Sequence, residues 1–212
     1  MSRVMASVKS IPINIDFDGT VVTHEFPQVG KSIGAEPVLQ ELVEAGHRLI
    51  LFTMRSDDQV NEKTGKTVLQ DAVDWFADRG LPLWGVQTNP EQHTWTSSPK
   101  SYAPLMIDDS ALGIPLKPPN KYMSHRSYVD WVKVRMLLVE RGLLDGWSQG
   151  KRGLHLFVGG VQVGLAFPIG SRWNVFASLG THDELLKEFG CLDEAAKAIE
   201  EYYRENDWRW PS

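Results

Sequence analysis

The sequence has little of several features, and each shortage excludes a class of protein. Its 212 residues include one cysteine, Cys191, which excludes a small fold held together by disulfides. It contains no apolar run of about 18 residues, as a membrane-spanning helix requires, and its first residues resemble no secretory signal. Neither sign of charge dominates, because 22 Lys and Arg residues face 27 Asp and Glu residues spread along the chain. We therefore expect a cytoplasmic protein without an electrostatic footprint for membranes or duplex nucleic acid.

The residues that are present indicate a folded α/β protein. Hydrophobic residues make up 42% of the chain, and the eight tryptophans add to the evidence against disorder. Between residue 11 and about residue 115, short apolar runs alternate with stretches of helical periodicity. Strands are expected at 11–17, 47–53, 83–87 and 105–107, and helices at 36–45 and 67–79. This order predicts a Rossmann-like parallel sheet with helices on both faces.

The rest of the chain has a different pattern. Three prolines at 115, 118 and 119 indicate a link, and a helix is expected at 127–141. Alternation around Gly159-Gly160 predicts a hairpin, followed by a third strand at 173–178 and a helix at 192–203. The sequence thus predicts a core at 1–118, a helical extension at 119–149, and a small C-terminal α+β unit of three strands and one helix at 150–212.

Two acidic motifs follow expected strands. The first is DFDGT, residues 16–20, and the second is Asp108-Asp109 directly after LMI. Ligands of open α/β sheets bind at the carboxyl ends of the strands, so these acids are candidates for a site there. Alone, the first motif is equally typical of a surface turn. The adjacent acids of the second motif repel each other unless a cation lies between them.

Thr53 and Lys100 indicate a site only when they are considered together with the two acidic motifs, in their order along the chain. Thr53 closes the buried run LILFT, where its hydroxyl could donate to a phosphoryl oxygen or simply cap the next segment. Lys100 lies between Thr53 and the second acidic motif, and a single lysine is usually a solvated surface charge. Each residue is ordinary by itself, but the ordered set of four motifs is not.

In that order, IDFDGT, LILFT, a later lysine and LMIDD resemble the four signatures of the haloacid dehalogenase-like (HAD) superfamily of phosphohydrolases. The stretches THEFPQVG, EAGHRLILFTMR and IDDSALGIP are similar to small cap-free members from bacteria and phages. This resemblance covers about residues 11–116. The later stretch SYVDWVKVRMLLVERGLL looks like the tail of phage-type members.

The resemblance implies Mg²⁺-dependent hydrolysis of a phosphate monoester through an aspartyl-phosphate. It assigns the nucleophile to Asp16, the general acid and base to Asp18, and the orientation of the phosphoryl oxygens to Thr53 and Lys100. The implied Mg²⁺ ligands are Asp16, the backbone carbonyl of Asp18, Asp108, and Asp109 either directly or through water. The residues expected to contact the substrate are Gly19, Thr20, Met54 and Arg55. For Arg55, a surface ion pair with Asp57 or Asp58 is an equal alternative.

The sequence does not identify the substrate. The segments between the motifs leave no room for a folded cap, so an open site is expected, with His24–Gly30, Arg55–Lys66 and Thr88–Pro99 around it. His93 and Trp95 are candidates to stack on a base or, alternatively, to pack on the body of the protein. The expected partner is a nucleotide or another phosphorylated small molecule, with nucleic acid only as a phosphorylated end.

Two other functions remain open at this stage. One is a phage-type HAD-fold protein that sequesters or docks a phosphorylated ligand or a protein partner with little turnover. The other is a phosphotransferase. We also expect the 150–212 unit to pack on the 127–141 helix and the core, in the same chain or in a second copy that forms an oligomer. The alternative is a self-contained appendage that contacts a partner.

Overall fold

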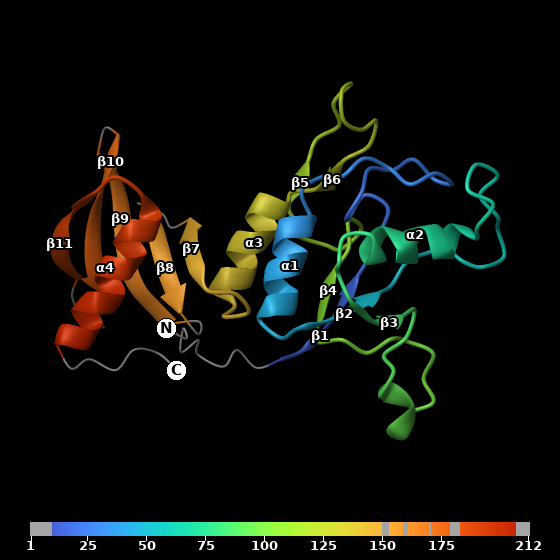
Figure 1. Cartoon of the computed structure of the whole chain (residues 1–212), viewed down its shortest axis with the longest axis horizontal. Coiled ribbons are helices and arrows are strands. Elements are labelled where there is room, and N and C mark those ends of the chain that lie inside the picture. Colours follow the sequence, from blue (N-terminus) through green and yellow to red (C-terminus); the bar gives the residue numbers. More distant parts are fainter. Residues whose placement is uncertain (1–9, 150–152, 159–160, 170, 179–182, 207–212) are drawn as a thin grey trace. The chain divides into compact units, whose positions relative to one another are not determined.

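The computed structural model describes residues 10–149, 153–158, 161–169, 171–178 and 183–206 (Figure 1). The chain divides into two compact units, and the division falls between Val134 and Arg135. We call residues 10–134 the parallel unit and residues 135–206 the antiparallel unit, and we describe each by itself. This division differs from the predicted boundaries at 118 and 149, because residues 119–134 lie in the parallel unit and residues 135–149 in the antiparallel unit.

The parallel unit is built on a four-stranded sheet. Its strands lie in the order β3-β2-β1-β4, and every neighbouring pair is parallel. The bounds are Pro12–Ile15 for β1, Arg48–Leu51 for β2, Leu83–Val86 for β3 and Leu105–Ile107 for β4. All four strands were predicted from their apolar runs. Because the strands are parallel, their carboxyl ends meet at one edge of the sheet.

Two helices connect neighbouring strands of this sheet. Helix α1 (Glu36–Glu44) buries Val38, Leu39 and Leu42, and it ends before Gly46, whose φ of 88° suits a helix terminus. Helix α2 (Val68–Ala77) is capped at its N-terminus by Thr67, whose hydroxyl accepts a hydrogen bond from the Gln70 N–H group. Both helices were predicted to within two residues at each end. The resulting mixed α/β fold is the one that the sequence indicates.

The sequence from 115 to 130 folds differently from the predicted link. Strands β5 (Leu116–Lys117) and β6 (Tyr128–Val129) form a short antiparallel pair, and helix α3 (Trp131–Glu140) begins four residues later than predicted. The Val129 N–H group donates to the Gly19 carbonyl at 2.9 Å, and Trp131 Nε1 donates to the Thr20 carbonyl at 2.6 Å. These long-range bonds hold residues 128–131 against the end of β1.

The antiparallel unit contains a five-stranded sheet in the order β11-β10-β9-β8-β7, followed by helix α4 (Leu192–Glu205). The strands are β7 (Gly146–Gln149), β8 (Leu154–Val158), β9 (Val161–Ile169), β10 (Arg172–Ser178) and β11 (Asp183–Phe189). Helix α4 presents Ala195, Ile199 and Tyr203 to a core that includes Val163 and Val175. The predicted turn at Gly159-Gly160 lies outside the described residues.

The predicted number of three strands in this unit is wrong. The two strands that were missed, β7 and β11, lie at the two edges of the sheet. Four of the seven residues of β11 (DELLKEF) are charged, as is common where an edge strand must not pair with another chain. Such a strand lacks the apolar alternation from which the inner strands were predicted. Among all described residues, no helix is long and apolar enough to cross a membrane.

Candidate functional site

Three carboxylates meet at the carboxyl edge of the parallel sheet. Asp16 directly follows β1, and Asp108 and Asp109 directly follow the neighbouring strand β4. One oxygen from each of the three lies within 4.8 Å of the others. The Asp16 N–H group donates to the Ile107 carbonyl at 3.0 Å, which continues the β1–β4 pairing beyond the last strand residue. We call these three residues the carboxylate cluster.

Thr20 joins the two halves of the carboxylate cluster. Its hydroxyl donates to Asp16 Oδ2 at 2.9 Å and accepts from the Asp109 N–H group at 2.9 Å. The side chain is fully buried and its only hydroxyl hydrogen is used on Asp16. The structure therefore makes Thr20 a residue that positions Asp16 and Asp109, and its predicted contact with substrate stays a prediction.

Gly19 and His24 complete the packing beside Asp109. His24 Nε2 lies 2.9 Å from Asp109 Oδ2. Gly19 has a φ of 83°, and a Cβ atom there would clash with both the His24 ring and the Asp109 carboxylate. Gly19 itself is buried. Gly19 thus allows His24 to pack closely on Asp109, and its predicted contact with substrate stays a prediction. The sequence had marked His24 only as part of the segment His24–Gly30.

The cluster has the donor chemistry of a site for a hard divalent cation. Burial raises the pKa of Asp16 from its ordinary 3.8 to about 7, and the charges of Asp108 and Asp109 act in the same direction. Bonds from Thr20 and from the Phe17 backbone oppose this rise. Asp108 Oδ1 accepts from the Ser110 N–H group at 2.8 Å and from the Ser110 hydroxyl at 2.6 Å, which fixes its orientation. Oxygen ligands from two or three carboxylates suit Mg²⁺.

Arg55 is buried and is bound to Asp18. Its Nε donates to Asp18 Oδ2 at 2.7 Å, and Nη2 donates to Asp18 Oδ1 at 2.8 Å. Its remaining bonds run from Nη1 to the carbonyls of Pro27 and Val68 and from Nη2 to the carbonyl of Gln28. All five guanidinium hydrogens are thus used. The alternative of a surface ion pair with Asp57 or Asp58 is wrong, because Arg55 is buried and its partner is Asp18. The predicted contact of Arg55 with a substrate phosphate stays a prediction, and it requires one of these bonds to be released.

Gln87 holds the segment that carries Thr53. Its φ is 62°, and its side chain accepts from the Thr53 N–H group at 3.1 Å and donates to the carbonyls of Thr53 and Arg55. The Thr53 hydroxyl accepts from the Arg55 N–H group at 3.3 Å, so its own hydrogen is available to a ligand. Met54, in between, is 97% exposed. Nothing in the sequence marked Gln87 as part of the site.

Lys100 is exposed, and its ammonium group has no hydrogen bond or ion pair with any residue that the structure describes. It lies in the segment that leads into β4, where the next residue, Ser101, bonds with the Asn14 side chain in β1. Its predicted role stays a prediction. In the same segment, Trp95 packs edge-to-face on Tyr102 with the ring centroids 5.4 Å apart, which is the packing alternative to base stacking.

Comparison with known proteins adds little to this geometry. No family model matches the chain, and no curated protein matches it either. It is similar to one solved structure, described as that of a conserved protein coded by a locus from Bacteroides thetaiotaomicron. The two are 30% identical, the match covers 63% of this chain and 93% of that chain, and the TM-score is 0.48. That description gives no activity, so the site is interpreted from its own residues.

Proposed function

We propose that this protein is a Mg²⁺-dependent phosphatase that cleaves phosphate monoesters through an aspartyl-phosphate on Asp16. The observation that carries the proposal is the carboxylate cluster at the adjoining ends of β1 and β4. The four-motif resemblance to the HAD superfamily supports it, together with the Rossmann-like arrangement of helices on both faces that the resemblance implies. Asp16, Asp108, Asp109 and the carbonyl of Asp18 are the proposed ligands of the cation.

The chemistry follows from the placement of these groups. Asp16 attacks the phosphorus atom, the ester oxygen leaves, and water then attacks the same phosphorus atom and regenerates the carboxylate. When bound, Mg²⁺ screens the charge of the carboxylates from that of the phosphate. The Thr53 hydroxyl and the Lys100 ammonium group donate to the phosphoryl oxygens in this proposal. Asp16 must be deprotonated to attack. Its pKa is raised to about 7 in the metal-free protein, and a cation held by the same carboxylates would favour the deprotonated form.

Asp18 raises a specific question about the leaving group. A general acid must carry a proton, yet both Asp18 oxygens accept hydrogen bonds from Arg55. To protonate a leaving oxygen, Asp18 has to release at least one of these bonds. This geometry favours a second candidate function, in which the protein binds a phosphorylated ligand with little turnover.

Phosphate release from two esters separates these functions. A 4-nitrophenyl ester has a leaving group that needs no proton, whereas an alkyl ester needs one. The phosphatase proposal expects Mg²⁺-dependent turnover of both esters. It also expects Asp18→Asn to slow the alkyl ester at least tenfold more than the aryl ester. Binding of both esters without Mg²⁺-dependent phosphate release would instead establish the second candidate.

A further inference from the structure

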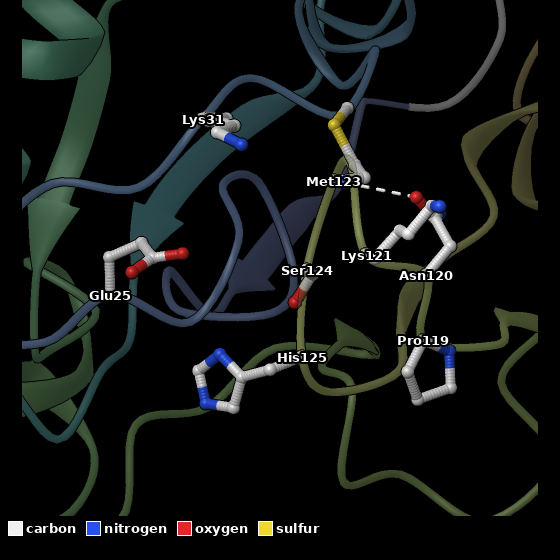
Figure 2. Close-up of a pocket in the computed structure, with 8 residues that line it drawn as sticks. All are labelled: Glu25, Lys31, Pro119, Asn120, Lys121, Met123, Ser124 and His125. Carbon is white, nitrogen blue, oxygen red and sulfur yellow. Dashed lines mark hydrogen bonds between the residues drawn. The ribbon is translucent and has the colours of Figure 1, made fainter.

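The parallel unit contains a pocket of about 400 Å³, lined by residues that follow His24 in the chain and by the 119–125 segment (Figure 2). Glu25 and Lys31 line one side, and residues of the 119–125 segment, including Ser124 and His125, line the other. The carboxylate of Glu25 and the ring of His125 point into the space between these segments. The volume is sufficient for part of a small organic substrate.

Chain connections and hydrogen bonds link the walls of this pocket to the proposed reaction centre. Glu25 directly follows His24, which bonds with Asp109. The Thr23 N–H group donates to the Lys31 carbonyl, and the Lys31 N–H group donates to the Thr23 hydroxyl, both at 2.9 Å. Lys31 is thereby held beside Thr23, which directly precedes His24. The 119–125 segment leads into β6, which bonds with Gly19. Both walls of the pocket are therefore continuous with residues that position Asp109.

The polar groups of the pocket favour an anion. The Lys31 ammonium group donates to the Tyr122 carbonyl at 2.9 Å, and two of its three hydrogens are left for a ligand. His125 is exposed, and neither of its ring nitrogens has a partner in the described part of the chain. Lys121 adds a second positive charge, against one negative charge from Glu25. This local excess of positive charge contrasts with the chain's net charge of −5.

We propose that this pocket binds a second anionic group on the leaving portion of the substrate, with Lys31 and His125 as its donors. The inference rests on the proposed function, because it takes the first phosphate to lie at the carboxylate cluster. The preferred substrates are then phosphate monoesters that carry a further phosphate or carboxylate. Simple monophosphates fill only the reaction centre and leave the Lys31 donors to water.

Three aryl phosphates test this preference: phenyl phosphate, 4-carboxyphenyl phosphate and 1,4-phenylene bisphosphate. Preference is the kcat/KM of an ester that carries a second anionic group divided by that of phenyl phosphate, compared between variants of the full chain. We expect Lys31→Gln to lower the preference about tenfold, because it removes a charge-assisted hydrogen bond. Glu25→Gln should raise the preference several-fold, because it removes the opposing charge. Comparing 4-carboxyphenyl phosphate with 1,4-phenylene bisphosphate shows whether the pocket takes a carboxylate, a phosphate or both.

Lys63→Gln is the matched control, since it removes one positive charge from an exposed lysine that does not line the pocket. Opposite shifts for Lys31→Gln and Glu25→Gln, with no shift for Lys63→Gln, would support the inference. A merely structural role of these side chains would not produce opposite signs. An unchanged preference in Lys31→Gln, or an equal shift in Lys63→Gln, would overturn it.

Calorimetric binding separates failure of the pocket from failure of the proposed function. Asp16→Asn, loaded with Mg²⁺, is titrated with 1,4-phenylene bisphosphate and with phenyl phosphate, with and without Lys31→Gln. If the wild-type protein shows no turnover but Lys31→Gln weakens the bisphosphate about tenfold, the pocket stands and the phosphatase proposal fails. If turnover occurs but neither preference nor binding responds to Lys31→Gln, the pocket inference alone fails. If neither turnover nor binding occurs, both are overturned.

Discussion

The two units of this protein differ in what they bury. Among the described residues, every buried polar or charged side chain lies in the parallel unit, apart from Ser178 in the antiparallel unit. The buried polar set of the parallel unit includes Asn14, Thr20, Arg55, Asn61 and Asp71. The core of the antiparallel unit is instead formed by apolar residues between its sheet and α4. The described buried polar groups are therefore concentrated in the parallel unit, which also carries the carboxylate cluster.

This contrast predicts that substitutions in the two units will have different kinds of effect. Changes at the carboxyl edge of the parallel sheet should alter activity, charge balance and the stability of residues 10–134. Changes in the apolar core of the antiparallel unit should alter packing alone. The following experiments test this difference, starting with the largest expected effect.

Replacing the proposed nucleophile should have the largest effect. We expect Asp16→Asn to reduce Mg²⁺-dependent phosphate release at least 10³-fold, because covalent catalysis is lost. The fold should persist, because an Asn oxygen can still accept from Thr20. Circular dichroism checks the fold, and Asp57→Asn, an exposed acid outside the cluster, is the matched control. Activity within tenfold of the wild type would remove Asp16 from the mechanism.

The second effect concerns the buried guanidinium group. We expect Arg55→Met to lower the unfolding free energy of the parallel unit by about 3–5 kcal/mol, because Asp18 and three backbone carbonyls lose their donor. Arg79→Met is the control, since Arg79 is more exposed, pairs with Glu36 and lies over the Trp75 ring. This variant should lose less than about 1 kcal/mol of unfolding free energy.

Hydrogen exchange resolved along the sequence measures this effect in each unit. Faster exchange in residues 10–134 with unchanged exchange in residues 135–206 would agree with the contrast between the units. Equal acceleration in both would show that they unfold as one, and the contrast would then have no energetic meaning.

The third effect is a dependence of stability on pH in the absence of divalent cations. The pKa of Asp16 is 3.8 ordinarily and about 7 in the folded protein, so the folded state binds this proton more tightly. The binding of this proton therefore contributes fully to the free energy of unfolding below about pH 4. This contribution is lost as the pH rises to about 7. Because Asp16 is partly accessible to solvent, we expect the free energy of unfolding to fall by about 2–4 kcal/mol over this pH range. Urea unfolding in EDTA at pH 5 and pH 8 measures it.

Asp16→Asn serves as the control for that titration, since the amide cannot ionise. Its stability should vary less between these two pH values than that of the wild type, by the same few kcal/mol. Parallel pH profiles for the two proteins would contradict the assignment of the raised pKa to Asp16.

The smallest effect is a packing change in the antiparallel unit. A Cβ on Gly164 would clash with Ile199 Cδ1 and lie 3.2 Å from the Phe176 carbonyl. We expect Gly164→Ala to destabilise by about 1–3 kcal/mol. Ile199→Val removes the clashing atom, so the double variant should lose less stability than the sum of the two single variants. Strict additivity in urea unfolding, or a changed kcat, would contradict a purely packing role.

Local sequence patterns predicted the parallel sheet well and the edges of the antiparallel sheet poorly. Strands β1 and β2 are largely buried and β3 and β4 are partly exposed, but all four are mostly apolar runs, so the residues of each strand were enough to predict it. Strands β7 and β11 depend on partners elsewhere in the chain, and the charges of β11 conceal it. The strand β6 was similarly absorbed into a predicted helix, because its pairing with β5 leaves no local mark.

The same distinction applies to the site. The order of the acidic motifs and the parallel topology predicted that Asp16 and Asp108 would meet, because adjacent parallel strands share one edge. The ion pair of Arg55 with Asp18, the His24–Asp109 contact and the Gln87 clamp join loops far apart in sequence. Their geometry depends on the complete fold, so residue type and spacing could not reveal them.

Calorimetric titration of the metal-free protein with Mg²⁺ tests most directly whether the carboxylate cluster is one divalent-cation site. We expect a single binding event that tightens between pH 6 and pH 8, as Asp16 loses its proton. Asp108→Asn should weaken this binding at least tenfold, whereas Asp57→Asn should leave it unchanged. Mg²⁺ binding that is equal in the wild type and in Asp108→Asn, or that does not change with pH, would contradict a metal site at these three carboxylates.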